Sequence, residues 1–371
     1  EAVRTSVLPQ HAGLLLSTAK AVEELRILTG DFVTSDEEMA DIRARYDEIF
    51  AACARTPGGF LHEPDPRGFY DVPREERVKL WDKLYDEPGF GIWLSNFREI
   101  FMDEAANAEL SEYIADRIRR RVKDPKVAEK LIPKDHGFGV QRLPLETKYF
   151  EAYNRDNVQL VDVSETPLVR VTENGLRTTE RDYEFDIIVY ATGFDAITGA
   201  YDLIDIQGIG GESLADRWKH GPSTFLGMLV HGFPNLLMPT GPQSASASTN
   251  FPRGIENGVN WCMDLLQYMW DRGYTRADAT REAQERWAAH VAKMYEIMLL
   301  RKAQGWFTGY NSNVAGHEAG TIRYIVYNGG TPKFVSIIKD VAARGYQEIE
   351  SRRGATADLP AAAAASVSAA E

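Results

Sequence analysis

The sequence lacks most of the residues that build disulfide frameworks and metal sites. Its 371 residues include only two cysteines, Cys53 and Cys262, which lie far apart and show no metal-ligand spacing. This pattern argues against a disulfide-stabilised fold and a zinc site, and it favours a reducing compartment. The seven histidines show no such spacing either. Each histidine is therefore expected to be a surface or packing residue rather than a metal ligand.

The sequence also lacks long apolar runs and an excess of positive charge. No stretch reaches the roughly 18 apolar residues of a membrane span, and the first residues show no signal-peptide pattern. The formal net charge is −13, which argues against an electrostatic footprint for nucleic acid. We therefore expect a cytoplasmic protein that neither spans a membrane nor binds nucleic acid.

The usual catalytic signatures are missing as well. G-x-S-x-G, H-E-x-x-H and Walker motifs do not occur. Residues 89–94 (GFGIWL) and 137–142 (GFGVQR) begin as G-x-G but lack the third small residue, and neither follows a predicted strand. Residues 208–213 (GIGGES) are predicted to form a loop. The sequence therefore shows no complete phosphate-binding glycine loop.

What is present is a globular composition, 44% apolar and 11% aromatic, in a chain long enough for two or three domains. Residues 35–130 are predicted to be helical and to contain no strand. Ser35 and Glu38 form a capping-box pattern, after which apolar residues share one helical face: Met39, Ile42, Tyr46, Ile49 and Phe50.

Two further helices are predicted over 74–90 and 107–124, and the second must stop or bend at Asp124-Pro125. The basic run Arg119–Arg121 is interpreted as a solvated helix face.

The character of the sequence changes after residue 136. Residues 157–163 are predicted to form a strand, and Asn174-Gly175 indicates a β-hairpin. The run DIIVYATGF, 186–194, is typical of a buried parallel strand that ends at a glycine.

Two long helices are predicted over 253–270 and 277–299, and the alanine-rich tail is predicted to be disordered. In the first of these helices a structural stripe is expected from Ile255, Val259, Cys262, Leu266 and Met269.

Three segments resemble the Baeyer–Villiger monooxygenases, class B flavoproteins that oxidise ketones with FAD, NADPH and O2. The first segment is HGFGVQRLPLETKYFEAYNRDNVQLVDV, 136–163, and the second is ATGFDAITGAYDLIDIQG, 191–208. The third is 233–261 together with 303–330. In the first segment the family pattern is matched by Phe138, Gly139, Arg142, Leu145, Tyr149, Phe150, Glu151, Tyr153, Asn154, Arg155, Asn157 and Val158. The resemblance covers about residues 31–350.

The resemblance implies an α/β fold: incomplete FAD- and NADP-binding Rossmann-like domains with a helical insertion. Residues 1–30 are unplaced and 31–133 correspond to the helical insertion. Residues 134–190 correspond to the C-terminal part of the NADP-binding domain, 191–350 to that of the FAD-binding domain, and 351–371 to a disordered tail. Because the family's two glycine-rich loops precede the matched part, we expect exposed apolar surface where their strands would pack.

The resemblance also implies an activity. A C4a-peroxyflavin would insert one oxygen atom next to a ketone carbonyl and yield an ester or lactone, with the ketone and O2 as the small-molecule partners. Two alternatives remain open: a related class B enzyme that oxidises nitrogen or sulfur, and a truncated remnant that is inert or binds a partner.

Arg142 is the catalytic residue that the resemblance implies, because a guanidinium stays charged and offers a fork of donors to an anion. The alternative is a structural salt bridge from Arg142 to a nearby carboxylate such as Glu146. Gln141 stands where many family members have a lysine that meets the 2′-phosphate of NADPH. Glutamine cannot supply that charge.

The remaining site residues also come from the resemblance. Trp306 is expected to contact the nicotinamide cofactor, with a core position as the alternative. The small and polar loop 241–251 would bring Asn250 and Phe251 to the flavin, with a flexible surface loop as the alternative. Thr192 and Gly193 are expected at the sheet edge, either at the flavin cofactor near its diphosphate or at the domain hinge, and Asp195 lies at the same junction. The substrate pocket is expected to include Ser246, Asn311 and Asn313.

Overall fold

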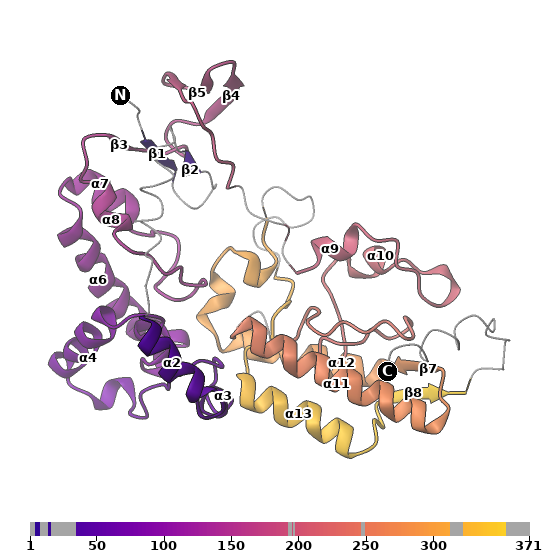
Figure 1. Ribbon diagram of the computed structural model, residues 1–371. Coiled ribbons are helices and arrows are strands. Elements are labelled where there is room, and N and C mark those ends of the chain that lie inside the picture. The colour runs from indigo at the N-terminus through magenta and orange to yellow at the C-terminus, as the bar shows by residue number, and fades with distance from the viewer. Residues whose placement is uncertain are drawn as a thin grey trace. The chain divides into compact units, whose positions relative to one another are not determined.

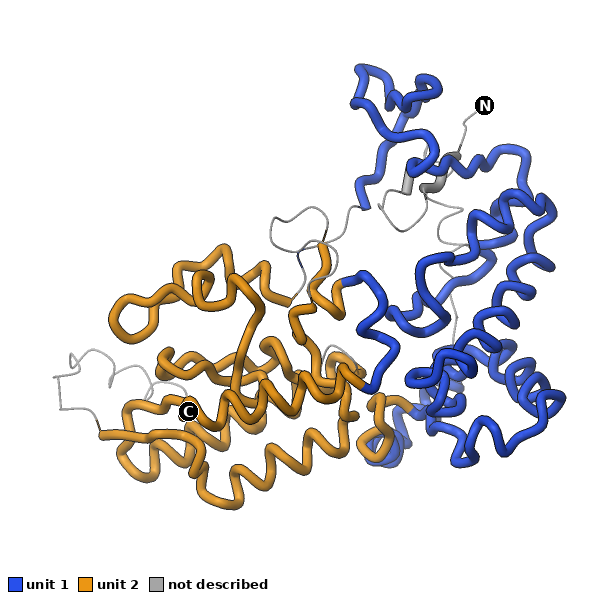
Figure 2. The backbone as a smooth tube through the Cα atoms, turned by 180° about the vertical axis from the view of Figure 1, so that it is seen from behind, with its two compact units in different colours: residues 1–52, 61–195, 297–305 blue, residues 53–60, 196–296, 306–371 orange. Residues whose placement is uncertain are grey.

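A computed structural model of the chain describes residues 35–191, 195, 197–245, 249–311 and 322–353, with the backbone alone of residues 4–7 and 14–15. The chain divides into two compact units (Figure 2). Unit 1 contains residues 1–52, 61–195 and 297–305, and unit 2 contains residues 53–60, 196–296 and 306–371. A short segment from the C-terminal half of the sequence, 297–305, therefore belongs to the unit that carries Arg142.

The helical stretch predicted over 35–130 is confirmed, and it contains no strand (Figure 1). Its helices are α2 (Asp36–Ala44), α3 (Tyr46–Cys53), α4 (Arg74–Asp86), α5 (Gly91–Leu94), α6 (Glu104–Arg121) and α7 (Pro125–Leu131), with 3₁₀ turns at Phe69–Asp71 and Arg98–Phe101. The capping box is present, since the Ser35 hydroxyl accepts from Glu38 N at 3.1 Å and Glu38 accepts from Ser35 N at 2.8 Å. Asp124 caps α7, which starts at Pro125. Local capping chemistry thus sets these helix ends.

The apolar face predicted for the first helix is not a buried face. No residue of α2 is buried, and Ile42, Tyr46 and Phe50 are between 36% and 41% exposed. Helical spacing places these side chains on one side of the helix, but tertiary packing decides whether anything covers that side.

The core of the helical part surrounds Trp81, which is fully buried. Its indole N–H donates to Asn96 Oδ1 at 3.1 Å, so the polar atom of this ring is satisfied inside the core. The cluster consists of Phe69, Val72, Trp81, Leu84, Ile92, Phe97, Ile100, Ala106 and Leu110. It supports the start of α6 and the loop that follows α7.

The strands of unit 1 form two small sheets. Strand β3 (Val158–Val161) confirms the strand predicted at 157–163, and it pairs in parallel with β1 (Arg4–Val7), which in turn pairs with β2 (Leu14–Leu15). No pattern in residues 1–30 had indicated these two strands. A parallel pair joins segments that are far apart in sequence, so neither strand reveals its partner.

The hairpin predicted at Asn174-Gly175 is confirmed. Strands β4 (Leu168–Thr172), β5 (Gly175–Thr178) and β6 (Asp182–Glu184) form an antiparallel sheet in the order β4-β5-β6. Gly175 begins β5, and a Cβ atom there would lie 1.9 Å from the Tyr183 carbonyl oxygen. The glycine is required by the close approach of β6 to β5.

The prediction of a buried strand at 186–191 is wrong in this structure. These residues form no strand, and Ile187, Val189 and Tyr190 are 39%, 37% and 66% exposed. Their composition suits a strand that is covered on both faces, yet a strand exists only where a neighbour accepts its hydrogen bonds. The run therefore contributes exposed apolar side chains to the surface of unit 1. The end of the run, 192–194, lies outside the described residues.

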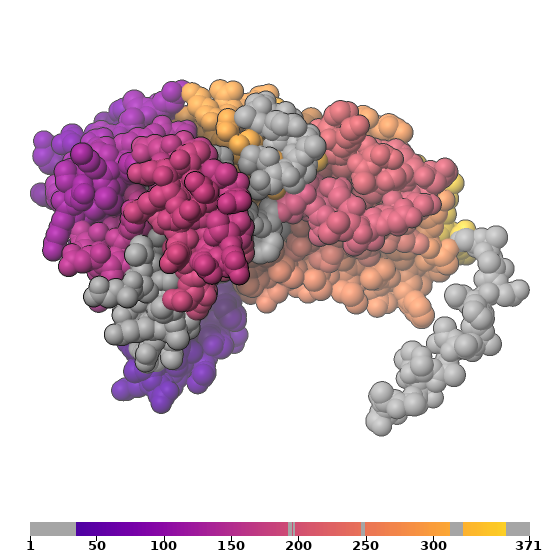
Figure 3. All heavy atoms as spheres, turned by 90° about the horizontal axis from the view of Figure 1, so that it is seen from above, coloured from indigo at the N-terminus to yellow at the C-terminus, as the bar shows by residue number. Residues whose placement is uncertain are grey.

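Unit 2 is built around three longer helices, α11 (Phe251–Arg272), α12 (Arg281–Glu296) and α13 (Thr331–Ala343). α11 and α13 run side by side (Figure 1), and the Trp261 indole N–H donates to Ile338 O at 2.8 Å between them. Smaller helical elements of unit 2 are α9 (Gly199–Asp202), α10 (Leu214–Trp218) and 3₁₀ turns at Ile209–Gly211 and Trp306–Thr308. Unit 1 contains α8 (Tyr149–Ala152) and a 3₁₀ turn at Leu299–Lys302. α9 and α10 lie at the surface of unit 2 (Figure 3), where Leu203 is 89% exposed.

The helix predicted at 253–270 is confirmed as α11, but its stripe is divided. Cys262 and Met269 are buried, whereas Ile255, Val259 and Leu266 are 37% to 42% exposed. α11 carries two adjacent apolar faces, and only one of them is packed. The α11 exposed face consists of Phe251, Ile255, Val259, Met263, Leu266 and Trp270.

Two predicted boundaries are wrong because of strand pairing. The helix predicted at 277–299 begins only at Arg281, since residues 276–279 form β7 (Arg276–Ala279). β7 pairs with β8 (Ile349–Arg352), so Ser351 and Arg352 are not part of a disordered tail. Residues 354–371 of the predicted tail lie outside the described residues.

Within the described ranges, every helix is too short or too polar to cross a membrane. The same ranges contain no group of three or more acidic, histidine or cysteine side chains suited to a metal ion. Cys53 and Cys262 are both buried and free.

Candidate active site

Arg142 lies in an irregular stretch of unit 1 between α7 and α8. The first residues of this stretch are hydrogen-bonded to the helical part. Trp93 Nε1 donates to Gly139 O at 3.2 Å, and Asn107 Nδ2 donates to Phe138 O at 2.9 Å. Gly139 has φ +72°, and a Cβ atom there would lie 2.7 Å from the Trp93 ring. Only glycine fits this turn, so the chain reaches Arg142 along a fixed path.

The Arg142 side chain is half-buried, and burial lowers the pKa of its guanidinium from the ordinary value. Arginine starts so far above neutrality that the group remains a cation. A partly desolvated cation of this kind attracts an anion more strongly than a fully hydrated one does. The position therefore suits an anionic group.

Gln141 ties this stretch to the segment 297–305 of the same unit. Its amide nitrogen donates to Gln304 O at 2.9 Å. Next to it, Val140 packs with Leu299 and Ala303. The neighbour of Arg142 thus holds residues that directly precede Trp306 in the chain.

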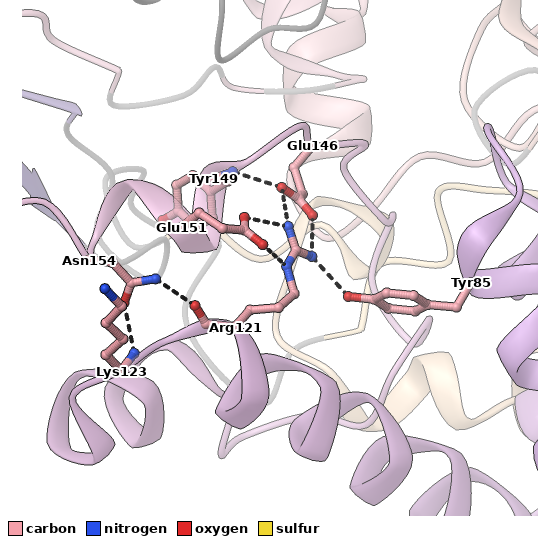
Figure 4. A network of polar contacts seen from close by, with 7 residues as sticks. All are labelled: Tyr85, Arg121, Lys123, Glu146, Tyr149, Glu151 and Asn154. Carbon is pink, nitrogen blue, oxygen red and sulfur yellow. Dashed lines mark hydrogen bonds and ion pairs between the residues drawn. The ribbon is translucent and has the colours of Figure 1, made fainter.

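On the other side of Arg142, Glu146 is held by Arg121 rather than by Arg142. Arg121 Nη1 and Nη2 donate to the two Glu146 oxygens at 2.7 and 3.2 Å, and Tyr149 N donates to Glu146 Oε2 at 2.8 Å (Figure 4). Glu146, the carboxylate given as the example for a structural salt bridge with Arg142, is therefore bound by Arg121 instead.

The same contacts correct the interpretation of the basic run 119–121. Arg119 is a surface residue that pairs with Glu112, Asp116 and Glu129. The Arg121 side chain is only 22% exposed and is the centre of a polar network. Its importance was not readable from the sequence, because the run RIRRR gives no sign of which arginine turns inward.

Unit 2 contains the loop 241–251, and its described part is not a flexible surface loop. Gln243, Ser244 and Thr249 are 2% to 4% exposed. Gln243 Oε1 accepts from Thr224 N at 2.9 Å, and Gln243 O accepts from Trp287 Nε1 at 3.2 Å. The small, polar residues of this loop suggested that it would be exposed. Their polar groups are buried instead, and hydrogen bonds such as those of Gln243 compensate for the lost contact with water.

Asn250 and Phe251 stand at the start of α11. Asn250 is the N-cap, and its Oδ1 accepts from Arg253 N at 3.4 Å. Asn250 N donates to Gly58 O at 2.8 Å, which fixes this helix end against the 53–60 segment of the same unit. Phe251 is 43% exposed. An exposed aromatic ring suits contact with an aromatic ligand.

Trp306 is half-buried and stacks on Phe307 with ring centroids 4.3 Å apart. It is therefore not a core tryptophan, which was the alternative for this residue. Asn311 is also half-buried and lies at the end of the same described segment. Unit 2 thus carries Asn250, Phe251, Trp306 and Asn311, whereas unit 1 carries Gln141 and Arg142.

Several predicted site residues lie outside the described residues: Thr192, Gly193, Ser246 and Asn313. Asp195 is described and half-buried, with no regular secondary structure.

Comparison with known proteins defines the class. The chain is 41% identical over 323 residues to the 2-oxo-Δ3-4,5,5-trimethylcyclopentenylacetyl-CoA monooxygenase of Pseudomonas putida, covering 86% of this chain and 58% of that protein. It is 40% identical over 314 residues to the cyclopentanone 1,2-monooxygenase of a Comamonas strain, covering 84% and 56%. It is 32% identical over 338 residues to a Baeyer–Villiger monooxygenase of Pseudooceanicola batsensis, covering 91% and 60%.

The structure agrees with these matches. It superimposes on the crystal structure of OTEMO in complex with FAD and NADP with a TM-score of 0.79 and 40% identity, covering 86% of this chain and 58% of that one. No family model matches the chain. The chain spans a little under three fifths of the length of the first relatives it matches.

The matched part is thus that of a flavoprotein monooxygenase with an α/β fold, which confirms the predicted fold class. Within that class the matched part is similar to Baeyer–Villiger monooxygenases.

Proposed function

We propose that this chain carries the catalytic arginine of an FAD- and NADPH-dependent monooxygenase that converts a ketone into an ester or lactone. The reaction consumes ketone, O2, NADPH and a proton, and it releases the ester, water and NADP⁺. One oxygen atom enters the ester, the other becomes water, and NADPH supplies two electrons. The half-buried Arg142, in a chain 40% identical to a cyclopentanone monooxygenase, is the observation that carries the proposal.

Arg142 would hold negative charge at the reacting centre. Its guanidinium cannot act as a proton source at working pH, so it stabilises an anion without quenching it. A flavin bound here would supply the chemistry that activates O2. The donor chemistry of Arg142 fits the reacting end of such a cofactor. The described residues contain no strand, glycine-rich turn and helix in succession for its phosphates, so no step is assigned to phosphate binding.

The other site residues keep the roles that the resemblance gave them, as part of this proposal. Gln141, Thr192, Gly193, Asn250, Phe251 and Trp306 would contact the cofactors, and Ser246, Asn311 and Asn313 would line the ketone pocket. Exposed Phe251 and half-buried Trp306 support the cofactor roles, because each offers an aromatic surface that the core does not use.

The division of the chain into five parts also stays a proposal, with the start of the tail moved beyond β8, and so does a cytoplasmic location. Two free buried thiols support a reducing compartment.

The test is to purify the chain, incubate it with FAD and measure flavin absorbance, NADPH oxidation and ester formation from cyclopentanone. We expect Arg142→Ala to lower ester formation by at least about 100-fold, since one charge-stabilising donor at a reacting centre is commonly worth that much. Arg119→Met, on the surface, is the matched control and should retain turnover.

Two results would contradict the proposal. A chain that stays colourless and forms no ester would favour the inert or partner-binding alternative. An Arg142→Ala variant with full ester formation would remove the catalytic role of that residue.

A further inference from the structure

Arg121 uses every donor that its side chain has. Nε donates to Glu151 Oε1 at 2.6 Å, and Nη2 donates to Glu151 Oε2 at 2.8 Å. Nη1 and Nη2 donate to the two Glu146 oxygens, and Nη1 also donates to the Tyr85 hydroxyl at 2.9 Å. An arginine has five N–H bonds, so the set is complete. Two carboxylates bound in bidentate fashion by one guanidinium form a strong, directional contact (Figure 4).

The backbone around Arg121 is tied to the same segment. Asn154 Nδ2 donates to Arg121 O at 2.7 Å, and Lys123 N donates to Asn154 Oδ1 at 2.7 Å (Figure 4). Asn154 thereby satisfies a carbonyl group that the end of α6 leaves without a helical partner. The Arg121 guanidinium also lies 4.9 Å from the centre of the Phe150 ring. The end of α6 thus binds residues 146–154 through several hydrogen bonds and ion pairs.

Between these anchors the backbone adopts an unfavourable conformation. Lys148 has φ +57°, in the left-handed region, directly before α8. A non-glycine residue remains there only when surrounding contacts require it. Glu146 on one side and Glu151 on the other, both bound to Arg121, supply those contacts.

Arg142 lies between two fixed points. Gln141, immediately before it, donates to Gln304 O, and Glu146, four residues after it, is bound to Arg121. Four residues span at most about 14 Å of extended chain, and Pro144 fixes one more dihedral angle within them. Releasing the Glu146 anchor would leave Arg142 on a longer free segment.

We propose that Arg121 is a positioning residue that fixes the loop carrying Arg142 by binding Glu146 and Glu151 at once. The functional meaning of this role rests on the proposed function of Arg142, but the conformational role does not. A positioning effect is expected because small displacements of a charge-stabilising group greatly reduce its contribution to the rate.

The test measures the loop directly. In Arg121→Met we expect the rates of hydrogen exchange in residues 141–150 and of tryptic cleavage after Arg142 to rise by about tenfold. In the wild type, local opening of this loop must break the bidentate contacts of Arg121, and in the variant these contacts are absent. Arg121→Lys keeps the charge but not the planar fork, so it should restore only part of the protection. Exchange in α4 and in the first half of α6 should stay unchanged.

Arg119→Met is the matched control, since it removes three ion pairs from the same helix without touching residues 142–154. Glu146→Gln provides a second route to the same opening, and its effect should not add to that of Arg121→Met. Unchanged exchange and cleavage in Arg121→Met, or an equal rise across α4, would overturn the proposal.

Activity separates this inference from the proposed function. If flavin-loaded protein forms ester, kcat per bound flavin should fall about tenfold in Arg121→Met, while KM for the ketone should change less than about twofold. If Arg121→Met shows the expected rise in exchange but the flavin-loaded wild-type chain forms no ester, the proposed function is contradicted and the positioning role of Arg121 stands.

Discussion

At the scale of single residues, charge and donor geometry decide the roles of three arginines that look alike in the sequence. Arg119 pairs with surface carboxylates, Arg121 organises a partly buried network, and Arg142 is half-buried in the adjoining loop. The sequence identified Arg142 through a family pattern of twelve matched positions. It did not identify Arg121, because the carboxylates that select this arginine lie 25 and 30 residues away.

The Arg121 network has a pH dependence that follows from Glu151. Hydrogen bonds from Arg121 hold the pKa of Glu151 below its ordinary value. A carboxyl with a lowered folded-state pKa stabilises the fold above its unfolded pKa, near 4.3, and this contribution disappears as the pH falls through the folded value. The Glu151 side chain is 42% exposed, so solvent screening keeps the effect below about 1 kcal/mol.

We therefore expect Glu151→Gln to lower the free energy of unfolding at pH 7 and to have little effect once the pH is below the folded-state pKa of Glu151. Denaturant unfolding at several pH values measures this difference. The same substitution in an Arg121→Met background is the control, and there the difference should be small at every pH. A difference that grows on acidification would contradict the assignment.

At the scale of elements, the position of helix α11 was predicted correctly, but the burial of its apolar residues was not. Its bounds follow from Asn250 at the N-cap and Gly273, with φ +64°, after the last turn. Periodicity cannot distinguish its two apolar faces. The face with Trp261 and Leu265 is buried, whereas the α11 exposed face is not.

The two faces should respond differently to substitution. Met263→Glu, at a side chain 57% exposed, should change the free energy of unfolding by less than about 1 kcal/mol. It should also reduce binding of a hydrophobic dye, because it interrupts the exposed apolar surface. Leu265→Ala, at a fully buried side chain, should cost about 2–5 kcal/mol.

Chemical denaturation and dye fluorescence measure both effects of these variants. A large loss of stability in Met263→Glu would show that the α11 exposed face is covered in solution.

At the scale of the whole molecule, the two cysteines both belong to unit 2 and report on the integrity of its fold. Cys53 and Cys262 are free and buried, and burial raises the pKa of the Cys262 thiol to about 11. A buried, protonated thiol reacts slowly with thiol reagents. We expect almost no reaction with a disulfide reagent at pH 8 in the folded protein and two thiols per chain after unfolding.

The melting temperature should also be the same with and without a reducing agent, since no disulfide contributes to stability. Rapid modification of both thiols in the folded chain, with an unchanged melting temperature, would contradict the burial described here.

The sequence by itself determined the local features: the capping box at Ser35, the stop at Asp124-Pro125, the hairpin near Gly175, and the family pattern around Arg142. Each depends on residues close together in the chain, whose backbone preferences and hydrogen bonds do not require a distant partner. Only the tertiary structure decided that β1 pairs with β3, that residues 186–191 form no strand, that Gln243 is buried, and that Arg121 binds Glu146 and Glu151. These outcomes depend on hydrogen bonds and burial between segments far apart in sequence, and a segment's own composition does not specify its partner.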